Sequence, residues 1–103
     1  RNALYRVLAD GSVENLYSLR ILNKDDRAHR YVIETQPTGV FQVDAEPVTV
    51  DAGEVRAVPA RLHVAQGDLD RAPRDVVIAV RTADDAGLMA GRTTRFFVPE
   101  PGR

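Results

Sequence analysis

The sequence predicts an all-β domain, folded as a sandwich of two antiparallel sheets. In several segments apolar and polar residues alternate with a period of two, which is typical of strands that bury one face. Turn signals separate these segments, and no stretch of about ten or more residues shows a helical period. In a chain of 103 residues this pattern indicates an immunoglobulin-like β-sandwich of about seven or eight strands.

The first half of the chain holds three predicted strands. Leu4–Leu8 and Val13–Asn23 flank Asp10-Gly11, a pair typical of a hairpin turn because glycine tolerates positive φ. Within the longer segment three apolar residues share the predicted inward face, namely Tyr17, Leu19 and Ile21. The third strand covers Tyr31–Thr35, and its inward face carries Tyr31, Ile33 and Thr35.

The next predicted strand is Val58–Val64, in which every second residue is apolar. Its residue Pro59 has no backbone N–H to donate to a ladder, so we expect this strand at a sheet edge or bulged at that position. The polar segment Ala65–Arg74 follows and has room for a single helical turn.

Two further strands are predicted in the last third of the chain. In Val76–Val80 the residues between the inward positions, Val77 and Ala79, are also apolar, which indicates that the second face is partly covered. A loop from Asp84 to Gly91 then leads to the last strand, Thr93–Val98, which is rich in β-branched and aromatic residues.

Length and composition limit both organisation and function. We expect one domain over residues 1–99, followed by a frayed tail at residues 100–103. With no cysteine, the chain has no disulfide, no thiolate metal site and no iron–sulfur cluster of its own. A net charge of −1 argues against a nucleic-acid partner. The longest apolar run, Val76–Val80, is far short of the roughly 20 residues that span a bilayer.

Histidine and methionine are the potential soft metal ligands of this chain. His29 lies among arginines at a predicted turn and His63 on the polar face of its strand, so we expect both to be solvated surface residues. Met89 lies in the predicted loop before the last strand. Histidine with methionine suits copper(I), so direct copper handling by His29, His63 and Met89 stays open as a minor alternative.

No arrangement of residues points to catalysis. Ser12 in a turn and Ser18 within a strand have no nucleophile motif around them. Paired carboxylates lie in predicted loops, where aspartate is common because it forms turns: Asp25-Asp26, Asp68-Leu69-Asp70 and Asp84-Asp85. We therefore assign no catalytic, cofactor-binding or metal residue, and we expect this chain not to be an enzyme.

One stretch resembles a known family. From Arg1 to Lys24 the chain is similar to the C-terminal domain of FixG/CcoG-type cytochrome c oxidase accessory proteins. That domain opens with Arg-Asn-x-Leu followed by Tyr or Phe, an Asp-Gly turn, and a strand that ends in Ile-x-Asn-Lys. The strand positions of the family pattern are filled here by Asn15, Tyr17, Leu19, Arg20, Ile21, Asn23 and Lys24. The match continues in Arg30–Ile33, Thr38–Val40 and Thr94–Pro99.

The resemblance implies an immunoglobulin-like domain that follows a membrane-embedded polyferredoxin. The parent would carry two [4Fe–4S] clusters upstream of this chain and support assembly of cbb3-type cytochrome oxidase by copper reduction and delivery. The domain would be tethered by a transmembrane helix on the periplasmic side of the bacterial inner membrane. For this chain the resemblance implies core roles for Tyr17, Leu19 and Ile21. It also implies that the amides of Asn15 and Asn23 bond the backbone.

For the chain itself this implies a non-catalytic docking module for proteins of the oxidase assembly machinery. An open strand edge and end loops are the usual contact surfaces of a sandwich, so we expect partner contacts at Pro59, Leu88 and Met89. The alternative is an adhesive or carbohydrate-binding sandwich of an exported protein. Sugar sites present exposed aromatic rings, whereas most of the six aromatic residues here lie on predicted inward faces.

Overall fold

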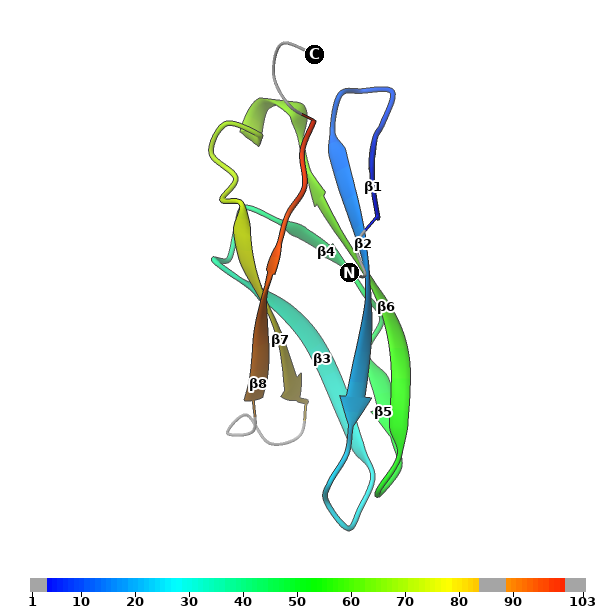
Figure 1. The fold of residues 1–103 in the computed structure, drawn as a ribbon. Coiled ribbons are helices and arrows are strands. Elements are labelled where there is room, and N and C mark those ends of the chain that lie inside the picture. Colours follow the sequence, from blue (N-terminus) through cyan, green and yellow to red (C-terminus); the bar gives the residue numbers. More distant parts are fainter. Residues whose placement is uncertain (1–3, 84–88, 100–103) are drawn as a thin grey trace.

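The computed structural model describes residues 4–83 and 89–99, which form two four-stranded antiparallel sheets packed face to face (Figure 1). One sheet has the order β1-β2-β6-β4 and the other the order β5-β3-β7-β8. The strands are β1 Leu4–Val7, β2 Val13–Leu22, β3 His29–Gln36, β4 Gln42–Asp44, β5 Val48–Val50, β6 Val55–Val64, β7 Asp75–Thr82 and β8 Met89–Arg95. The predicted immunoglobulin-like sandwich is confirmed.

The two ten-residue strands β2 and β6 form the backbone of the first sheet. Their ladder runs from Val13 opposite Val64 to Leu22 opposite Val55. Alternation decides which face is buried, because successive side chains of a strand point to opposite sides. Tyr17 and Ile21 are accordingly buried, and Leu19 is half-buried against the core. The core between the sheets also holds Ile33, Phe41, Val50, Val58, Leu62, Val64, Val76, Ile78 and Phe96.

The first hairpin forms as predicted. Gly11 has φ of +83°, and Leu8 N donates to Ser12 O at 2.9 Å while Gly11 N donates to Leu8 O at 2.9 Å. This is a turn with a glycine bulge, which needs a left-handed residue at that position. The turn sets the register of β1 on β2, with Val7 opposite Val13 and Leu4 opposite Leu16.

Strands β4 and β5 were not located by the sequence pattern. Each has three residues, which is too short for an alternation to be recognised. Between them the chain changes sheet, since β4 pairs with β6 and β5 pairs with β3. The linker, Ala45–Pro47, therefore crosses one side of the sandwich and leaves part of β6 without a second neighbour.

The second half of the chain departs from the prediction at one strand. The predicted helical turn is present as a 3₁₀ turn at Gln66–Asp68, and in β7 Ala79 is buried. The last strand, however, is β8 at Met89–Arg95 and not Thr93–Val98. Because β7 extends to Thr82, it offers ladder partners to residues that the sequence placed in a loop. Met89 thus pairs with Arg81.

The stretch after β8 closes the core at one end. Phe96 is almost fully buried, and its ring centroid lies 4.9 Å from that of Phe41. Its backbone N–H donates to Arg74 O at 2.7 Å. In the part of the chain that the structure describes, no helix is long and apolar enough to cross a membrane.

Candidate functional site

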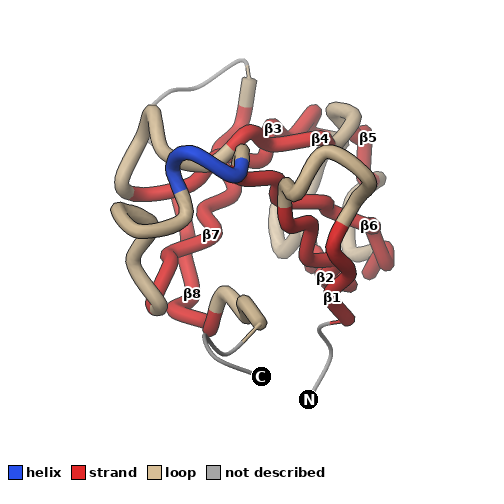
Figure 2. Tube along the Cα trace, turned by 90° about the horizontal axis from the view of Figure 1, so that it is seen from above, coloured by secondary structure: helices blue, strands red, loops and turns tan. Residues whose placement is uncertain are grey.

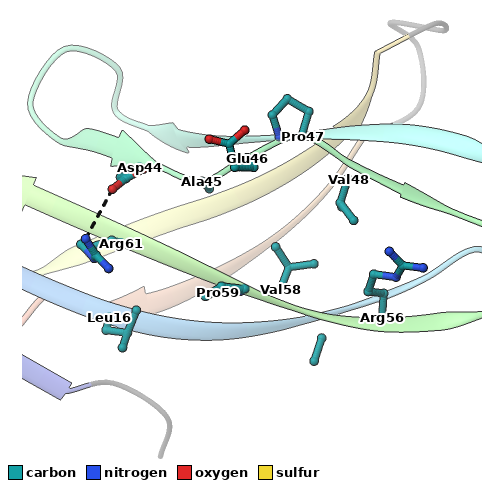
Figure 3. Close-up of a pocket in the computed structure, with 11 residues that line it drawn as sticks. Leu16, Asp44, Ala45, Glu46, Pro47, Val48, Arg56, Val58, Pro59 and Arg61 are labelled. Carbon is teal, nitrogen blue, oxygen red and sulfur yellow. Dashed lines mark ion pairs between the residues drawn. The ribbon is translucent and has the colours of Figure 1, made fainter.

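A shallow groove lies beside Pro59, on the side of the sandwich that the β4–β5 linker crosses (Figure 3). Its volume is about 320 Å³. We call it the Pro59 groove, and it is lined by Leu16, Asp44, Ala45, Glu46, Pro47, Val48, Arg56, Ala57, Val58, Pro59 and Arg61. Figure 3 shows the linker along one wall and β6 along the other.

The open edge of β6 forms one wall of this groove. β4 pairs only with Arg61–His63, so among the described residues no strand pairs with β6 on that side over residues 55–60. Pro59 falls in this exposed stretch, which agrees with the expected edge position although β6 as a whole is an interior strand. In a ladder, backbone groups of successive residues point to opposite sides. Counted through the β1–β2 and β2–β6 ladders, the backbone groups of Val55, Ala57 and Pro59 point to the open side of β6. Pro59 has no N–H to offer there.

Ion pairs neutralise one end of the Pro59 groove. Arg61 lies between two carboxylates, with Nη1 3.5 Å from Asp44 Oδ2 and Nε 3.7 Å from Glu14 Oε2. Glu14 also accepts a hydrogen bond from Arg6 Nε at 2.9 Å. The charges at this end therefore have partners within the domain, and the rest of the groove is largely apolar.

The other two predicted partner contacts cannot be placed in the Pro59 groove. Leu88 lies outside the described residues. Met89 begins β8, in the second sheet, and its side chain is also outside the described part. Of the three predicted contact residues, Pro59 is therefore the one that lines a described groove.

The prediction that His29 is solvated is wrong. Its side chain is buried, at 2% exposure, because β3 begins two residues before the predicted strand and His29 lies on the inward face, opposite Val50. His29 Nε2 lies 2.6 Å from Asp25 Oδ2. The hydrogen bond to His29, followed by that from Asp26 N, lowers the pKa of Asp25 to about 2.

The histidines do not form a joint metal site. His63 is half-buried on the outer face of β6, opposite Glu14. His29 follows the far end of β2, so the two lie at opposite ends of a ten-residue strand, about 30 Å apart at 3.3 Å per residue. Within residues 4–83 and 89–99 no group of three or more His, Cys, Asp or Glu could hold a metal ion.

The side of the sandwich away from the Pro59 groove lies between β2 and β8, and we call it the seam. Two side chains join the sheets there. Asn15, fully buried, donates from Nδ2 to Phe97 O at 2.9 Å and accepts from Phe97 N at 2.8 Å. Tyr17 Oη donates to Arg95 O at 2.7 Å, and burial raises the pKa of this phenol to about 12. The predicted role of Asn15 as a backbone partner is confirmed, and these bonds close the upper half of the seam.

The second predicted asparagine closes the tip where β2 turns into β3. Asn23 Nδ2 donates to Arg27 O at 2.8 Å and to Val50 O at 2.9 Å, while Oδ1 accepts from Asp25 N at 2.9 Å. The side chain thereby links the turn to β5 and holds the backbone of Asp25, whose carboxylate contacts His29. Its predicted role is confirmed too.

From Tyr17 toward Leu22 the seam is open, and this opening was not predicted from the sequence. Two adjoining grooves of about 440 and 330 Å³ share Arg20, Val80 and Ala90 among their lining residues. We call them together the open seam. Figure 2 shows β2 and β8 on facing sides of this part of the sandwich. A signal was present in the sequence, because a first strand of about five residues cannot cover a neighbour twice as long.

The comparisons with known proteins agree with this architecture. The profile of a family described as "IG-like fold at C-terminal of FixG, putative oxidoreductase" matches residues 1–99. A crystal structure of a FixG-related protein from Vibrio parahaemolyticus superimposes with a TM-score of 0.67 at 20% identity, covering 93% of this chain and 95% of that one. A protein from Archaeoglobus fulgidus gives 0.55 at 16% identity, covering 96% and 95%. A search of curated proteins finds no match.

The two structural likenesses concern the fold alone, because both identities are low. The family profile is more specific, since it covers all but the last four residues and includes the Asn15, Tyr17 and Asn23 positions whose contacts are described above. The chain belongs to the family of immunoglobulin-like domains found at the C-terminus of FixG.

Proposed function

We propose that this domain is a non-catalytic protein-docking module of a FixG/CcoG-type membrane polyferredoxin that supports assembly of cbb3-type cytochrome c oxidase. In this proposal the parent carries two [4Fe–4S] clusters upstream and takes part in copper reduction and delivery. The domain is held on the periplasmic side of the inner membrane by an upstream transmembrane helix. Its partners are proteins of the oxidase assembly machinery.

The observation that carries the proposal is the family match over residues 1–99, because it links the whole domain to FixG, which its description relates to oxidoreductases. The structure supports a binding role for the domain with a rigid sandwich that has open strand edges and grooves on both sides. Such edges are surfaces to which other chains add. No residue of this chain is assigned to a redox step.

The proposed contact surface of the predicted residues is the Pro59 groove, together with the region of Leu88 and Met89. Val58 is buried in the core, whereas Ala57 and Pro59 are exposed on the groove wall. An apolar side chain of a partner can lie against this wall without breaking an ion pair, because Arg61 keeps its contact with Asp44. Substitutions at Ala57 therefore disturb the surface while sparing the core.

The experiment compares the parent protein with a version that lacks residues 1–99 and with the variant Ala57→Asp. Assembled cbb3 oxidase is quantified by haem spectra and oxidase activity of the membranes, and cluster content of the parent by iron analysis. Thr49→Asp, on the exposed side of β5, is the matched control. We expect deletion to lower assembled oxidase at unchanged cluster content. Assembly at the wild-type level after deletion would overturn the proposal.

A further inference from the structure

The open seam has a composition that differs from that of the Pro59 groove. Apolar side chains from three strands line it, with Leu19 from β2, Ile78 and Val80 from β7, and Ala90 from β8. Arg20 and Arg92 are the charged lining residues, and neither of its two grooves is lined by a carboxylate. A ligand for this surface needs apolar side chains and negative charge.

The backbone of β2 is available along the same groove. β1 pairs only with Val13–Leu16, so among the described residues β2 has no second neighbour from residue 17 to 22. Because Leu8 N donates to Ser12 O across the hairpin, the even-numbered residues of β2 direct their backbone groups to the β1 side. Ser18, Arg20 and Leu22 therefore present N–H and C=O groups to the open seam, and none of them is a proline.

The two arginines carry charges that no described residue of the domain neutralises. Arg20 and Arg92 are exposed, and no carboxylate of residues 4–83 and 89–99 lies within 4.0 Å of either guanidinium. By contrast, Arg61 at the Pro59 groove pairs with Asp44 and Glu14. Unpaired cations along a groove raise the local concentration of anionic groups and favour an acidic partner.

The charge also argues against occupation by a second copy of this chain. The outer strand β8 of such a copy carries Arg92 and Arg95, which are both cationic. These arginines repel Arg20, whereas an acidic segment from another protein is attracted.

We propose that the open seam binds an extended acidic segment of a partner protein, which adds as a strand to residues 18–22 of β2, in line with β1. Alternate side chains of the segment enter the groove above Leu19, Ile78 and Val80, because neighbouring residues of a strand face opposite sides. The remaining side chains are carboxylates, placed beside Arg20 on the outer face, and Arg92 on the opposite rim adds positive potential. This inference rests on the proposed docking function and names its surface and partner chemistry.

The experiment uses the 103-residue chain and a synthetic octapeptide in which glutamate and valine alternate, with blocked ends. Binding is measured by calorimetry at low salt, and the site is located by amide hydrogen exchange. We expect binding that protects the amides of Ser18, Arg20 and Leu22. A peptide with glutamine in place of glutamate should bind about tenfold more weakly, and one with alternate amides N-methylated should not bind.

Variants of the chain assign the charges. Arg20→Ala should weaken binding about fivefold, Arg92→Ala about twofold, and the double variant about tenfold, in the range of exposed ion pairs. Arg56→Ala is the matched control, since Arg56 is an exposed arginine on the wall of the Pro59 groove. Its affinity should equal that of the wild type. All three residues are exposed, so the fold is retained.

Several results would overturn the inference. These are equal affinity for the glutamine peptide, protection of Val55 and Ala57 in place of β2, or an effect of Arg56→Ala as large as that of Arg20→Ala. The amides of Ser18 and Arg20 could already exchange slowly before peptide is added. If sedimentation shows a monomer at that concentration, the chain's own N-terminal residues occupy the edge of β2. The same result with a dimer would assign it to a second copy. If the peptide fails but deletion of residues 1–99 still lowers oxidase assembly, docking stands and this surface is wrong.

Discussion

The two sides of the sandwich offer similar grooves but treat their open strand edges differently. At the Pro59 groove the edge of β6 carries a proline, and the arginine at its end is paired with Asp44 and Glu14. At the seam the edge of β2 has no proline, and Arg20 and Arg92 have no acidic partner among the described residues. Proline at an open edge protects it against added strands, whereas the open edge of β2 has no proline and the two arginines beside it select a segment of opposite charge.

The seam itself is divided. At Asn15 and Tyr17 it is closed by side chains that bond the backbone of Phe97, just after β8, and of Arg95, the last residue of β8, whereas from Ser18 to Leu22 it is open. In the closed half, hydrogen bonds from two inward polar side chains link the sheets without a strand ladder between β2 and β8. The first two predictions test the closed half, the third tests the Pro59 edge, and the last tests the tip.

The largest effect is expected for Asn15→Leu. Asn15 is fully buried and satisfies both the N–H and the C=O of Phe97. Leucine keeps the volume but leaves both groups unpaired, which should lower the free energy of unfolding by about 2–3 kcal/mol. Urea unfolding measures this. Gln42→Leu, at an exposed position, is the control and should change stability little. Equal stability of the two variants would show that the seam is not held by Asn15.

A smaller effect is expected for Tyr17→Phe, which removes the hydrogen bond to Arg95 O and should cost about 1 kcal/mol. The pH dependence follows from the same group. Its pKa rises from 10.0 to about 12 on folding, so the protonated phenol stabilises the fold below pH 10 and this contribution is lost as pH rises through 12. Absorbance titration should show that the wild type has a phenol that ionises near pH 12 and that Tyr17→Phe lacks it. A wild type without a phenol that ionises in this range would contradict the prediction.

Pro59→Thr should change stability by about 0.5 kcal/mol or less, because the site is exposed. It restores the missing N–H donor to the open edge of β6, next to Ala57. We expect the variant to self-associate at concentrations where the wild type does not, measured by sedimentation velocity. A monomeric variant would show that Pro59 does not protect this edge. Ser18→Thr is the matched control on β2, since it leaves the number of donors unchanged.

The smallest effect concerns Asp25. Because folding lowers its pKa from 3.8 to about 2, the ionised carboxylate stabilises the fold above pH 3.8, and this contribution is lost as pH falls through 2. Asp25→Asn should therefore flatten the decline of the urea midpoint between about pH 5 and about pH 2. Asp70→Asn, in an exposed loop, is the control and should keep the wild-type slope. A slope unchanged by Asp25→Asn would contradict a specific role of the carboxylate.

The strands with clear alternation were predictable, and those without it were not. Val13–Leu22 and Val58–Val64 have their expected faces, because period-two burial is a local property of the sequence. The three-residue strands β4 and β5 carry no such signal, and β8 was placed too late because its ladder depends on the length of β7. His29 was misjudged for the same reason: arginines beside it in sequence indicated solvent, but its position opposite Val50 buries it.

The immunoglobulin-like sandwich, with its alternation of buried and exposed faces, was predictable from the sequence, and the first 24 residues carried the resemblance to the family. These properties depend on alternation, turn residues and motif order, all of which are local. Two contacts became visible in the folded structure alone, namely that Asn15 reaches the backbone of Phe97 and that Arg20 and Arg92 border one groove. The partners involved are separated by about 70–80 residues in the chain, and contacts of that range exist only once two sheets have packed.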